Sequence, residues 1–378
     1  MLQDILVVDF SQYLPGPYAT LRLADRGAQV IKVENLHGDP ARHPAAEDGG
    51  DGYLFRANGR NKESIVLNLK EESQRYVALD LISKADVVIE SFRPGVAKRL
   101  GISYEEAAAV NPGIVYCSLS GYGQNGPICQ LGSHDLNYMA VSGVLSQLTD
   151  DTGAPVMPSL TFADMIGGIA ASEAILAGLV QRGKTGKGVY LDIALADVMV
   201  SLLTNHILLE SVTGAQRGIP GLHRRLVCYA LYQTRDERYV ALCALEPKFW
   251  EEFCRAVEKP EWLSARISLQ RDDNPVYSQI KKLFRSRTLA EWTDFSLQVD
   301  CCLTPVLKVG EVRHHPQIKA RRLIAEKWGL RYVATAYQEG ESILANSLPA
   351  PELGQHTEDW LTRLMKKEKD HRGSRNGL

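Results

Sequence analysis

Two polar residues that could exchange protons with a substrate stand just ahead of two apolar helical patterns. Apolar residues recur at helical spacing after His134 as far as Val144, and a second such pattern follows Asp164 as far as Leu176. Each side chain is therefore expected at or near a helix N-terminus, where the helix dipole favours a neutral imidazole and an ionised carboxylate. Both groups could then accept a proton. Exposed N–H groups at the start of the Asp164 helix could hold an anionic oxygen.

The same residues also fit ordinary helix capping. A Ser-His-Asp run ahead of an apolar helix is a common N-cap signal, and so is an Asp ahead of a Gly-rich helix. Spacing alone therefore leaves two interpretations open for His134 and Asp164, an acid/base pair or a pair of caps.

The composition indicates a globular protein of ordinary charge. A chain of 378 residues predicts two domains, and 45% hydrophobic with 23% charged residues is typical of globular proteins. The 43 basic and 45 acidic residues give a net charge of −2. No overall attraction toward nucleic acid or an anionic membrane is expected.

Cysteine usage and the apolar pattern indicate a cytoplasmic location. The seven cysteines are odd in number, scattered and without CxxC spacing, which favours reduced thiols over disulfides or a zinc site. The first residues show neither the basic region nor the cleavage site of a signal peptide. No apolar run is expected to span a bilayer.

The first 200 residues alternate between strand and helix patterns. Such alternation predicts an α/β fold with a parallel sheet and helices on both faces. The first loop, residues 11–17, lacks the GxGxxG fingerprint, and no P-loop motif occurs, which disfavours nicotinamide dehydrogenases and nucleotide triphosphatases. The expected strands are residues 5–10, 29–34, 65–68, 87–90, 114–118 and 189–193.

The second half predicts a smaller α+β domain. We expect one long helix at 198–209, a Gly- and Pro-punctuated linker, and a hairpin of strands 229–234 and 239–244. Helices are expected at 248–257, 276–284 and 289–299, and a frayed tail at 366–378. The domain prediction is a large α/β domain of 1–200 with 318–378, a linker of 201–222, and a small domain of 223–317.

Motifs along almost the whole chain resemble, in the right order, those of the family III CoA-transferase superfamily. They are residues 5–10 with Pro15-Gly16-Pro17, 23–34, 58–62, 91–95, 119–123 and 314–316. The resemblance implies a large Rossmann-like CoA-binding domain, a smaller α+β domain, and an acyl-CoA substrate with no further cofactor. It also implies an interlocked homodimer, with each active site between the large domain of one chain and the small domain of the other.

Two chemistries occur in that superfamily, and the resemblance gives Asp164 a role in each. In the CoA-transferases the matching aspartate attacks the thioester and forms an acyl anhydride. In the alpha-methylacyl-CoA racemases it is one of two bases, and the other is a histidine at the start of a motif that matches residues 134–143 of this chain. Ser133 stands where the racemases commonly have Gly. The glutamate matching Glu246 pairs with that histidine. The alternative for Glu246 is an exposed charge ahead of Pro247, which suits a first helical position.

The resemblance also suggests residues that contact CoA. Arg93 and Arg99 match positions at the nucleotide or pyrophosphate, and guanidinium groups suit phosphate. Arg60 and Lys62 are weaker candidates, and Tyr138 is a candidate for the acyl-CoA channel. The alternatives are a solvated helix face for the two first arginines and a core position for Tyr138.

The preferred hypothesis is a 2-methylacyl-CoA racemase that inverts its substrate through an enolate. The second is a CoA-transferase, for which the best candidate for a glycine-rich loop, residues 217–221, has only two glycines. A CoA-binding protein without catalysis is the third. No partner besides acyl-CoA and a second copy of the chain is expected.

Overall fold

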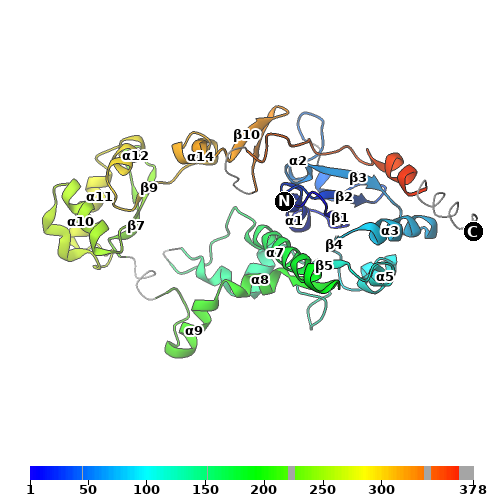
Figure 1. Cartoon of the computed structure of the whole chain (residues 1–378). Helices are drawn as coiled ribbons and strands as arrows, with labels where there is room; N and C mark the ends of the chain where they lie inside the picture. Colours follow the sequence, from blue (N-terminus) through cyan, green and yellow to red (C-terminus); the bar gives the residue numbers. More distant parts are fainter. Residues whose placement is uncertain (45, 151, 220–225, 336–341, 366–378) are drawn as a thin grey trace, which may run out of the picture. The chain divides into compact units, whose positions relative to one another are not determined.

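The chain forms two compact units, which we describe separately. The computed structural model describes the chain except residues 45, 151, 220–225, 336–341 and 366–378. The large unit comprises residues 1–203 and 319–378, and the small unit comprises residues 204–318 (Figure 1). The predicted frayed tail and the last three residues of the predicted linker lie outside the described residues.

A six-stranded parallel sheet forms the centre of the large unit, as predicted. Its strand order is β3-β2-β1-β4-β5-β6, and every neighbouring pair is parallel. The order reverses between β1 and β4, which lie side by side. The strands are β1 (Leu6–Asp9), β2 (Gln29–Glu34), β3 (Lys62–Val66), β4 (Val87–Glu90), β5 (Val115–Ser120) and β6 (Val189–Ala194).

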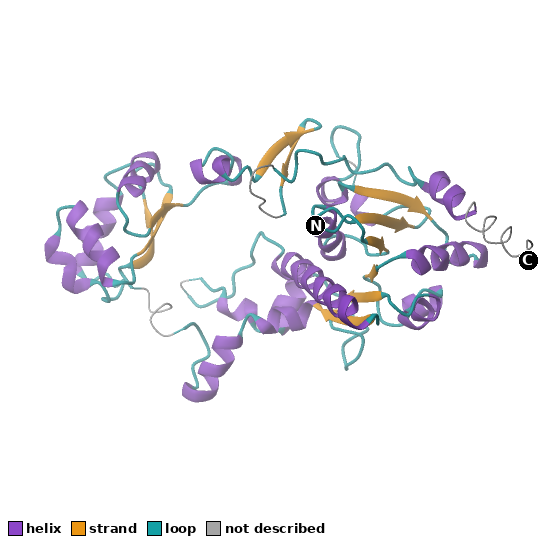
Figure 2. Ribbon diagram, in the orientation of Figure 1, coloured by secondary structure: helices purple, strands orange, loops and turns teal. Residues whose placement is uncertain are grey.

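Helices cover both faces of this sheet because its strands are apolar on both faces. Val7 and Val8 of β1 point to opposite faces, and each belongs to a different core cluster. The Val7 face packs against α1 (Pro15–Ala24), α6 (Asp135–Val141), α7 (Phe162–Thr185) and α8 (Leu195–Ser201). The Val8 face packs against α3 (Glu72–Lys84), α5 (Tyr104–Val110) and the helical residues 357–365 (Figure 2).

The longest helix departs from one expectation. The 24 residues of α7 are long and apolar enough to span a membrane by composition, although no such run was predicted. α7 packs against α1, α6, α8, β5 and β6, and its Ala171 and Ile175 are fully buried in the core. These contacts are those of a core helix of the large unit.

Shorter elements complete the large unit. A hairpin of two antiparallel strands follows the small unit in the chain. The elements are α2 (Tyr53–Gly59), α4 (Val96–Leu100), β10 (Ile324–Lys327), β11 (Leu330–Val333) and the 3-10 turns η1 (Pro40–Arg42) and η2 (Val144–Gln147).

The small unit is an α+β structure around three buried tryptophans, Trp250, Trp262 and Trp292. Its antiparallel sheet has the order β7-β8-β9, which confirms the predicted hairpin. The elements are α9 (Thr204–Thr213), β7 (Tyr229–Gln233), β8 (Tyr239–Cys243), α10 (Pro247–Ala256), η3 (Pro260–Ala265), α11 (Pro275–Phe284), α12 (Leu289–Gln298), β9 (Leu303–Pro305) and α13 (Val309–Val312). The short helix α14 (Pro316–Ala320) spans the boundary between the two units.

The prediction of one helix over 198–209 is wrong. α8 ends at Ser201 and α9 begins at Thr204. The N–H groups of Leu202 and Leu203 donate to carbonyls three residues earlier, at 3.1 and 2.9 Å. Such tightened bonds satisfy the last carbonyls of a helix and end it. The apolar spacing that continues across this break carries no sign of it.

Candidate active site

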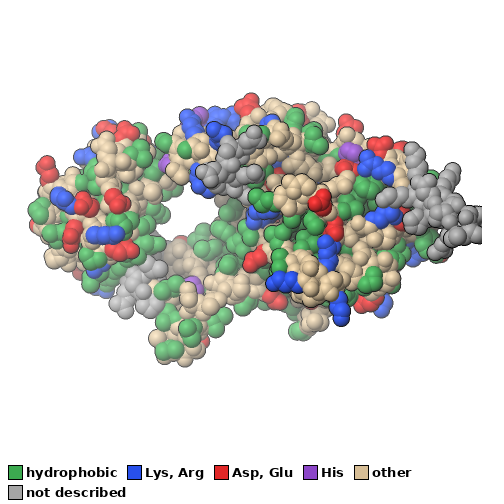
Figure 3. All heavy atoms as spheres, in the orientation of Figure 1, with side chains coloured by type: hydrophobic (Ala, Val, Ile, Leu, Met, Phe, Trp, Pro, Cys, Tyr) green, Lys and Arg blue, Asp and Glu red, His purple; other side chains and the backbone are tan. Residues whose placement is uncertain are grey.

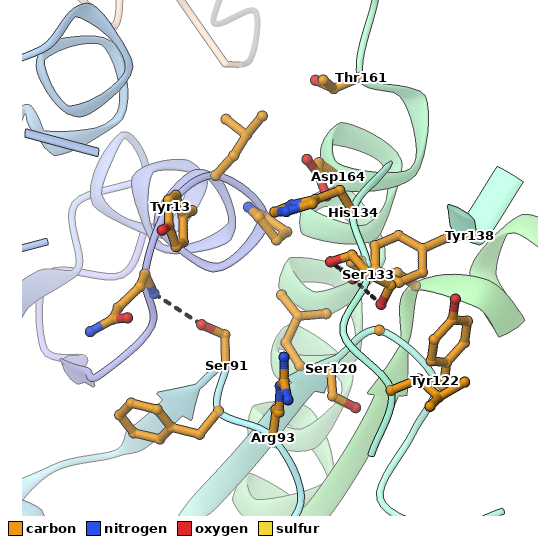
Figure 4. A pocket seen from close by; sticks show the side chains of 18 of the residues that line it. Tyr13, Ser91, Arg93, Ser120, Tyr122, Ser133, His134, Tyr138, Thr161 and Asp164 are labelled. Carbon is orange, nitrogen blue, oxygen red and sulfur yellow. Dashed lines mark hydrogen bonds between the residues drawn. The ribbon is translucent and has the colours of Figure 1, made fainter. Parts of the chain in front are cut away.

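A cavity of about 460 Å³ opens at the carboxyl ends of three neighbouring strands. Its walls include residues 12–15 after β1, 91–94 after β4 and 119–122 at the end of β5. The strand order reverses between β1 and β4, and open α/β sheets bind ligands at the carboxyl ends of the strands at such a point. Residues from the starts of α6 and α7 complete the walls (Figure 4).

His134 occupies the N-cap of α6, as predicted, and its side chain is exposed and lines the cavity. Its N–H donates to Oδ1 of Asn137 at 3.0 Å. The N–H of Asn137 in turn donates to the carbonyl of His134 at 2.8 Å. These two bonds hold the backbone of His134, so that the imidazole leaves a rigid point of the chain.

Asp164 is the third residue of α7 and lines the same cavity (Figure 4). The N-cap position of this helix is Thr161, so the N-cap alternative is wrong for Asp164. Burial, and after it the charge of Asp135, raises the pKa of Asp164 from 3.8 to about 6. The expected lowering by the helix dipole is therefore outweighed. In the described part of the chain, no hydrogen bond to the Asp164 carboxylate is found.

The backbone N–H of Asp164 is already engaged. It donates to Oδ1 of Asp135 at 3.0 Å. The expectation that the N–H groups at this helix start hold an anionic oxygen is therefore wrong for the N–H of Asp164 itself. Asp135 was not among the predicted site residues, and its position directly after His134 was the signal that could have found it.

Tyr138 forms a buried wall of the cavity. Its hydroxyl donates to the carbonyl of Ser133 at 3.1 Å and accepts from Oγ of Ser133 at 3.0 Å (Figure 4). A Cβ on Gly121 would lie 2.5 Å from the Tyr138 ring, so the ring fits only because position 121 is glycine. Tyr122 packs edge-on against the same ring.

Two glycines of α7 bring its neighbours close to Asp164. A Cβ on Gly168 would lie 2.6 Å from the carbonyl oxygen of Pro15, and one on Gly167 would collide with the side chain of Leu195. The missing side chain of Gly168 lets the start of α1 lie directly against α7, and that of Gly167 makes room for Leu195 of α8. The loop before α1 thereby becomes a wall of the cavity that contains Asp164.

The four basic residues suggested for CoA fall into two groups. Arg93 is exposed and lines the cavity, and Arg99 is exposed on α4 outside the cavity lining. Arg60 and Lys62 are buried and do not line this cavity. Arg60 forms an ion pair with Asp25.

Lys62 belongs to a network inside the large unit. Its Nζ lies 3.4 Å from Oδ2 of Asp9 and donates to Oγ1 of Thr20 and to the carbonyl of Pro17, each at 2.8 Å. Burial lowers the pKa of Lys62 to about 8. These contacts give Lys62 a structural role in which its charge faces Asp9.

Glu246 belongs to the small unit, where it is exposed at the N-cap position of α10, with Pro247 as the first helical residue. His134 and Asp164 belong to the large unit. Of the candidate glycine-rich loop, residues 220 and 221 lie outside the described residues.

The cavity offers acid/base and nucleophilic groups. His134 and Asp164 can each take or give a proton, and Asp164 can also attack an acyl carbon. Among the described residues, no group of three or more His, Cys, Asp or Glu side chains is arranged to hold a metal ion. Basic and acidic side chains are interspersed over the face seen in Figure 3.

The chain is similar to known proteins over nearly its whole length. Residues 2–357 match the sequence model of CoA-transferase family III. An acetyl-CoA:oxalate CoA-transferase of Acetobacter aceti is 32% identical over 334 residues, 86% of this chain and 86% of that protein. The human alpha-methylacyl-CoA racemase is 35% identical over 326 residues, 85% of this chain and 81% of that protein.

A solved structure agrees with these sequence comparisons. A CAIB/BAIF family protein from Brucella suis matches with a TM-score of 0.82 at 26% sequence identity, covering 95% of this chain and 98% of that one. The resemblance described from the motifs is thereby confirmed. This protein belongs to CoA-transferase family III, a family of enzymes that includes both CoA-transferases and alpha-methylacyl-CoA racemases.

Proposed function

We propose that the protein is an acyl-CoA racemase that inverts the carbon next to the thioester carbonyl of 2-methylacyl-CoA. The observation that carries the proposal is that His134 and Asp164 line one cavity. Inversion by proton transfer requires one proton carrier on each face of the carbon. A transferase that works through an acyl anhydride needs only the carboxylate at this place.

In the proposed reaction, one group removes the α-proton and the electron pair moves into the thioester carbonyl, which gives an enolate. The other group then returns a proton to the opposite face, so that the configuration is inverted and each group ends in the other protonation state. An Asp164 with a pKa of about 6 suits this exchange, since a group that titrates near neutral pH can both accept and return a proton. The reaction needs no cofactor besides the CoA of the substrate.

Arg93 is the proposed contact of the CoA phosphates. It is exposed, lines the cavity, and places its guanidinium beside the loop that leads to His134, where a Cβ on Gly132 would lie 2.8 Å from its Nη2. A guanidinium in such a position can bind phosphate with two hydrogen bonds. We propose a cytoplasmic location, which suits the free thiols.

The second candidate is a CoA-transferase, which the similarity to the acetyl-CoA:oxalate CoA-transferase favours. Here the Asp164 carboxylate attacks the thioester carbon, CoA thiolate leaves, and an acyl anhydride forms. CoA thiolate then attacks the Asp164 carbonyl carbon of the anhydride, which releases the first carboxylate and leaves a thioester between Asp164 and CoA. A second carboxylate attacks this thioester and displaces CoA thiolate, which gives a new anhydride. Attack of the thiolate on the incoming acyl carbon forms the new acyl-CoA and frees Asp164. His134 has no required part in these steps.

Incubation of the protein with (2R)-2-methylacyl-CoA in heavy water, without a carboxylate acceptor, distinguishes the two candidates. The proposal predicts that deuterium enters the α-position and that the 2S product forms. CoA transfer to added carboxylates, with no α-exchange, would replace the racemase by the transferase.

We also propose a homodimer in which Glu246 of a second copy of the chain orients His134. A carboxylate beside one ring nitrogen fixes the tautomer and leaves the other nitrogen free to accept a proton. Glu246 supports this role by its exposed position at the start of α10.

A further inference from the structure

The carboxylate of Asp135 joins the two helices that carry the proposed proton carriers. Asp135 is the first residue of α6 and follows His134 directly. Its Oδ1 accepts the N–H of Asp164, the third residue of α7, at 3.0 Å. This N–H is one of those that a helix start leaves without a partner. The bond therefore connects the beginning of α7 to the beginning of α6.

Asp135 also brings a second negative charge to Asp164. Two carboxylates at short range oppose each other's ionisation, and the charge of Asp135 contributes, after burial, to the raised pKa of Asp164.

Other charged or titratable side chains occur on elements packed against α7 or in the cavity wall. They are His134 and Tyr138 near α6, Tyr18 and Arg22 on α1, Tyr116 and Cys117 on β5, Tyr190 and Asp192 on β6, Asp197 on α8, and Tyr13, Arg93, Tyr122 and Cys129 in the loops.

We propose that Asp135 is a positioning residue for Asp164, since its carboxylate orients the first turn of α7 and its negative charge makes Asp164 a stronger base. The inference rests on the proposed proton transfer by Asp164. Because Asp135 directly follows His134 in the chain, the same bond joins the start of α6, where His134 lies, to the start of α7. A stronger base removes a weakly acidic α-proton faster.

Two substitutions separate the bond from the charge. Asp135→Asn keeps an oxygen that can accept the N–H of Asp164 and removes the charge, whereas Asp135→Ala removes both. Asp197→Asn is the matched control, because Asp197 is an exposed aspartate in the first turn of the neighbouring helix α8 and does not line the cavity. Each variant is measured for amide hydrogen exchange at the start of α7 and for the pH profile of α-proton exchange.

Asp135→Asn should leave the amide protection unchanged, move the acidic limb of the pH profile to lower pH, and slow exchange at high pH on the order of a few-fold. Asp135→Ala should also speed amide exchange at the start of α7 and reduce the rate by about 10- to 100-fold, because Asp164 loses its alignment. The control should behave as the wild type.

If the wild type exchanges the α-proton, either of two results would overturn the inference. One is an acidic limb that stays in place in Asp135→Asn, and the other is unchanged amide protection in Asp135→Ala. A wild type without α-exchange would instead contradict the proposed function, and both failures are thereby told apart.

Discussion

At the scale of single residues, burial outweighs the helix dipole at Asp164. The dipole stabilises a carboxylate near a helix start by about 0.3–1 kcal/mol. The pKa of Asp164 nevertheless rises from 3.8 to about 6. This shift means that the folded environment disfavours the ionised form over the protonated form by about 3 kcal/mol. An ionised Asp164 is therefore held in an environment that disfavours its charge, and this makes the group a better base.

Asp164→Asn should raise the stability of the folded protein at pH 8. A carboxyl group whose pKa is raised on folding stabilises the folded state below its ordinary pKa of 3.8, and this contribution is lost as pH rises through about 6. At pH 8 the ionised group thus costs up to about 3 kcal/mol, which the neutral amide avoids.

Unfolding by urea at pH 8 and pH 4 measures this effect. The gain from Asp164→Asn should be present at pH 8 and small at pH 4. An equal gain at both pH values would show that the pKa of Asp164 is not raised.

Substitution by alanine should lower the stability of the protein at Arg60 but weaken acyl-CoA binding at Arg93. Arg60→Ala leaves the buried Asp25 without its ion-pair partner, with only the hydrogen bonds from Asn61 and Thr335 remaining. Removing one member of a buried ion pair costs about 3–5 kcal/mol. Arg93 is exposed at the cavity, so Arg93→Ala should change the free energy of unfolding by at most about 0.5 kcal/mol and raise the KM for acyl-CoA. Urea unfolding and steady-state kinetics of both variants measure this, and a stable Arg60→Ala with a raised KM would make Arg60 a CoA ligand.

The sequence was sufficient to place His134 and Asp164 at helix starts, but not to place the buried basic residues. The helix starts at the first two follow from apolar spacing within a few residues. The ion-pair partner of Arg60, Asp25, lies 35 residues away in the sequence, and Asp9, which faces Lys62, lies 53 residues away. Such pairing depends on the folded sheet, so a basic residue in a CoA-binding motif could not be distinguished from a buried structural one.

At the scale of elements, Gly168 of α7 determines how closely α1 approaches the site. Gly168→Ala would place a Cβ 2.6 Å from the backbone oxygen of Pro15. Such overpacking costs about 1–3 kcal/mol and should also reduce activity, because the loop before α1 lines the cavity.

Gly183→Ala is the control on the same helix, since a Cβ there meets nothing within 4 Å. That substitution should stabilise the protein by about 0.5–1 kcal/mol without changing activity. Thermal unfolding and an activity assay of both variants measure this. Equal effects at positions 168 and 183 would contradict the role given to close packing.

The ends of β2 and β4 were predicted correctly because β4 is a short apolar run and the apolar residues of β2 are interrupted only by Lys32. β3 was predicted at 65–68 and lies at Lys62–Val66. Its first half is polar, although Lys62 and Ser64 are buried. Oγ of Ser64 donates to Glu34 of the next strand at 2.6 Å. Apolar pattern alone could not assign such residues to a strand.

At the scale of the whole molecule, the two units contain different parts of the proposed machinery. His134 and Asp164 lie in the large unit and Glu246 in the small one. The proposed homodimer explains this division, since each site would combine the large unit of one copy with the small unit of the other.

Co-expression of His134→Ala and Glu246→Gln chains should restore activity that neither variant has alone. In a mixed dimer, one site would combine both defects and the other would be intact. Random mixing should therefore give about one quarter of the wild-type activity. Mixed dimers without recovery would contradict a site shared between copies.

The central claim, two proton carriers on opposite faces of one carbon, is tested most directly by α-proton exchange of the separate 2R and 2S substrates in heavy water. The wild type should exchange both. Asp164→Asn and His134→Gln should each lose inversion, and each should still exchange one epimer with retention, a different one in each variant. One variant that exchanges neither epimer, with the other variant still exchanging both, would contradict the two-base account and leave a single catalytic group.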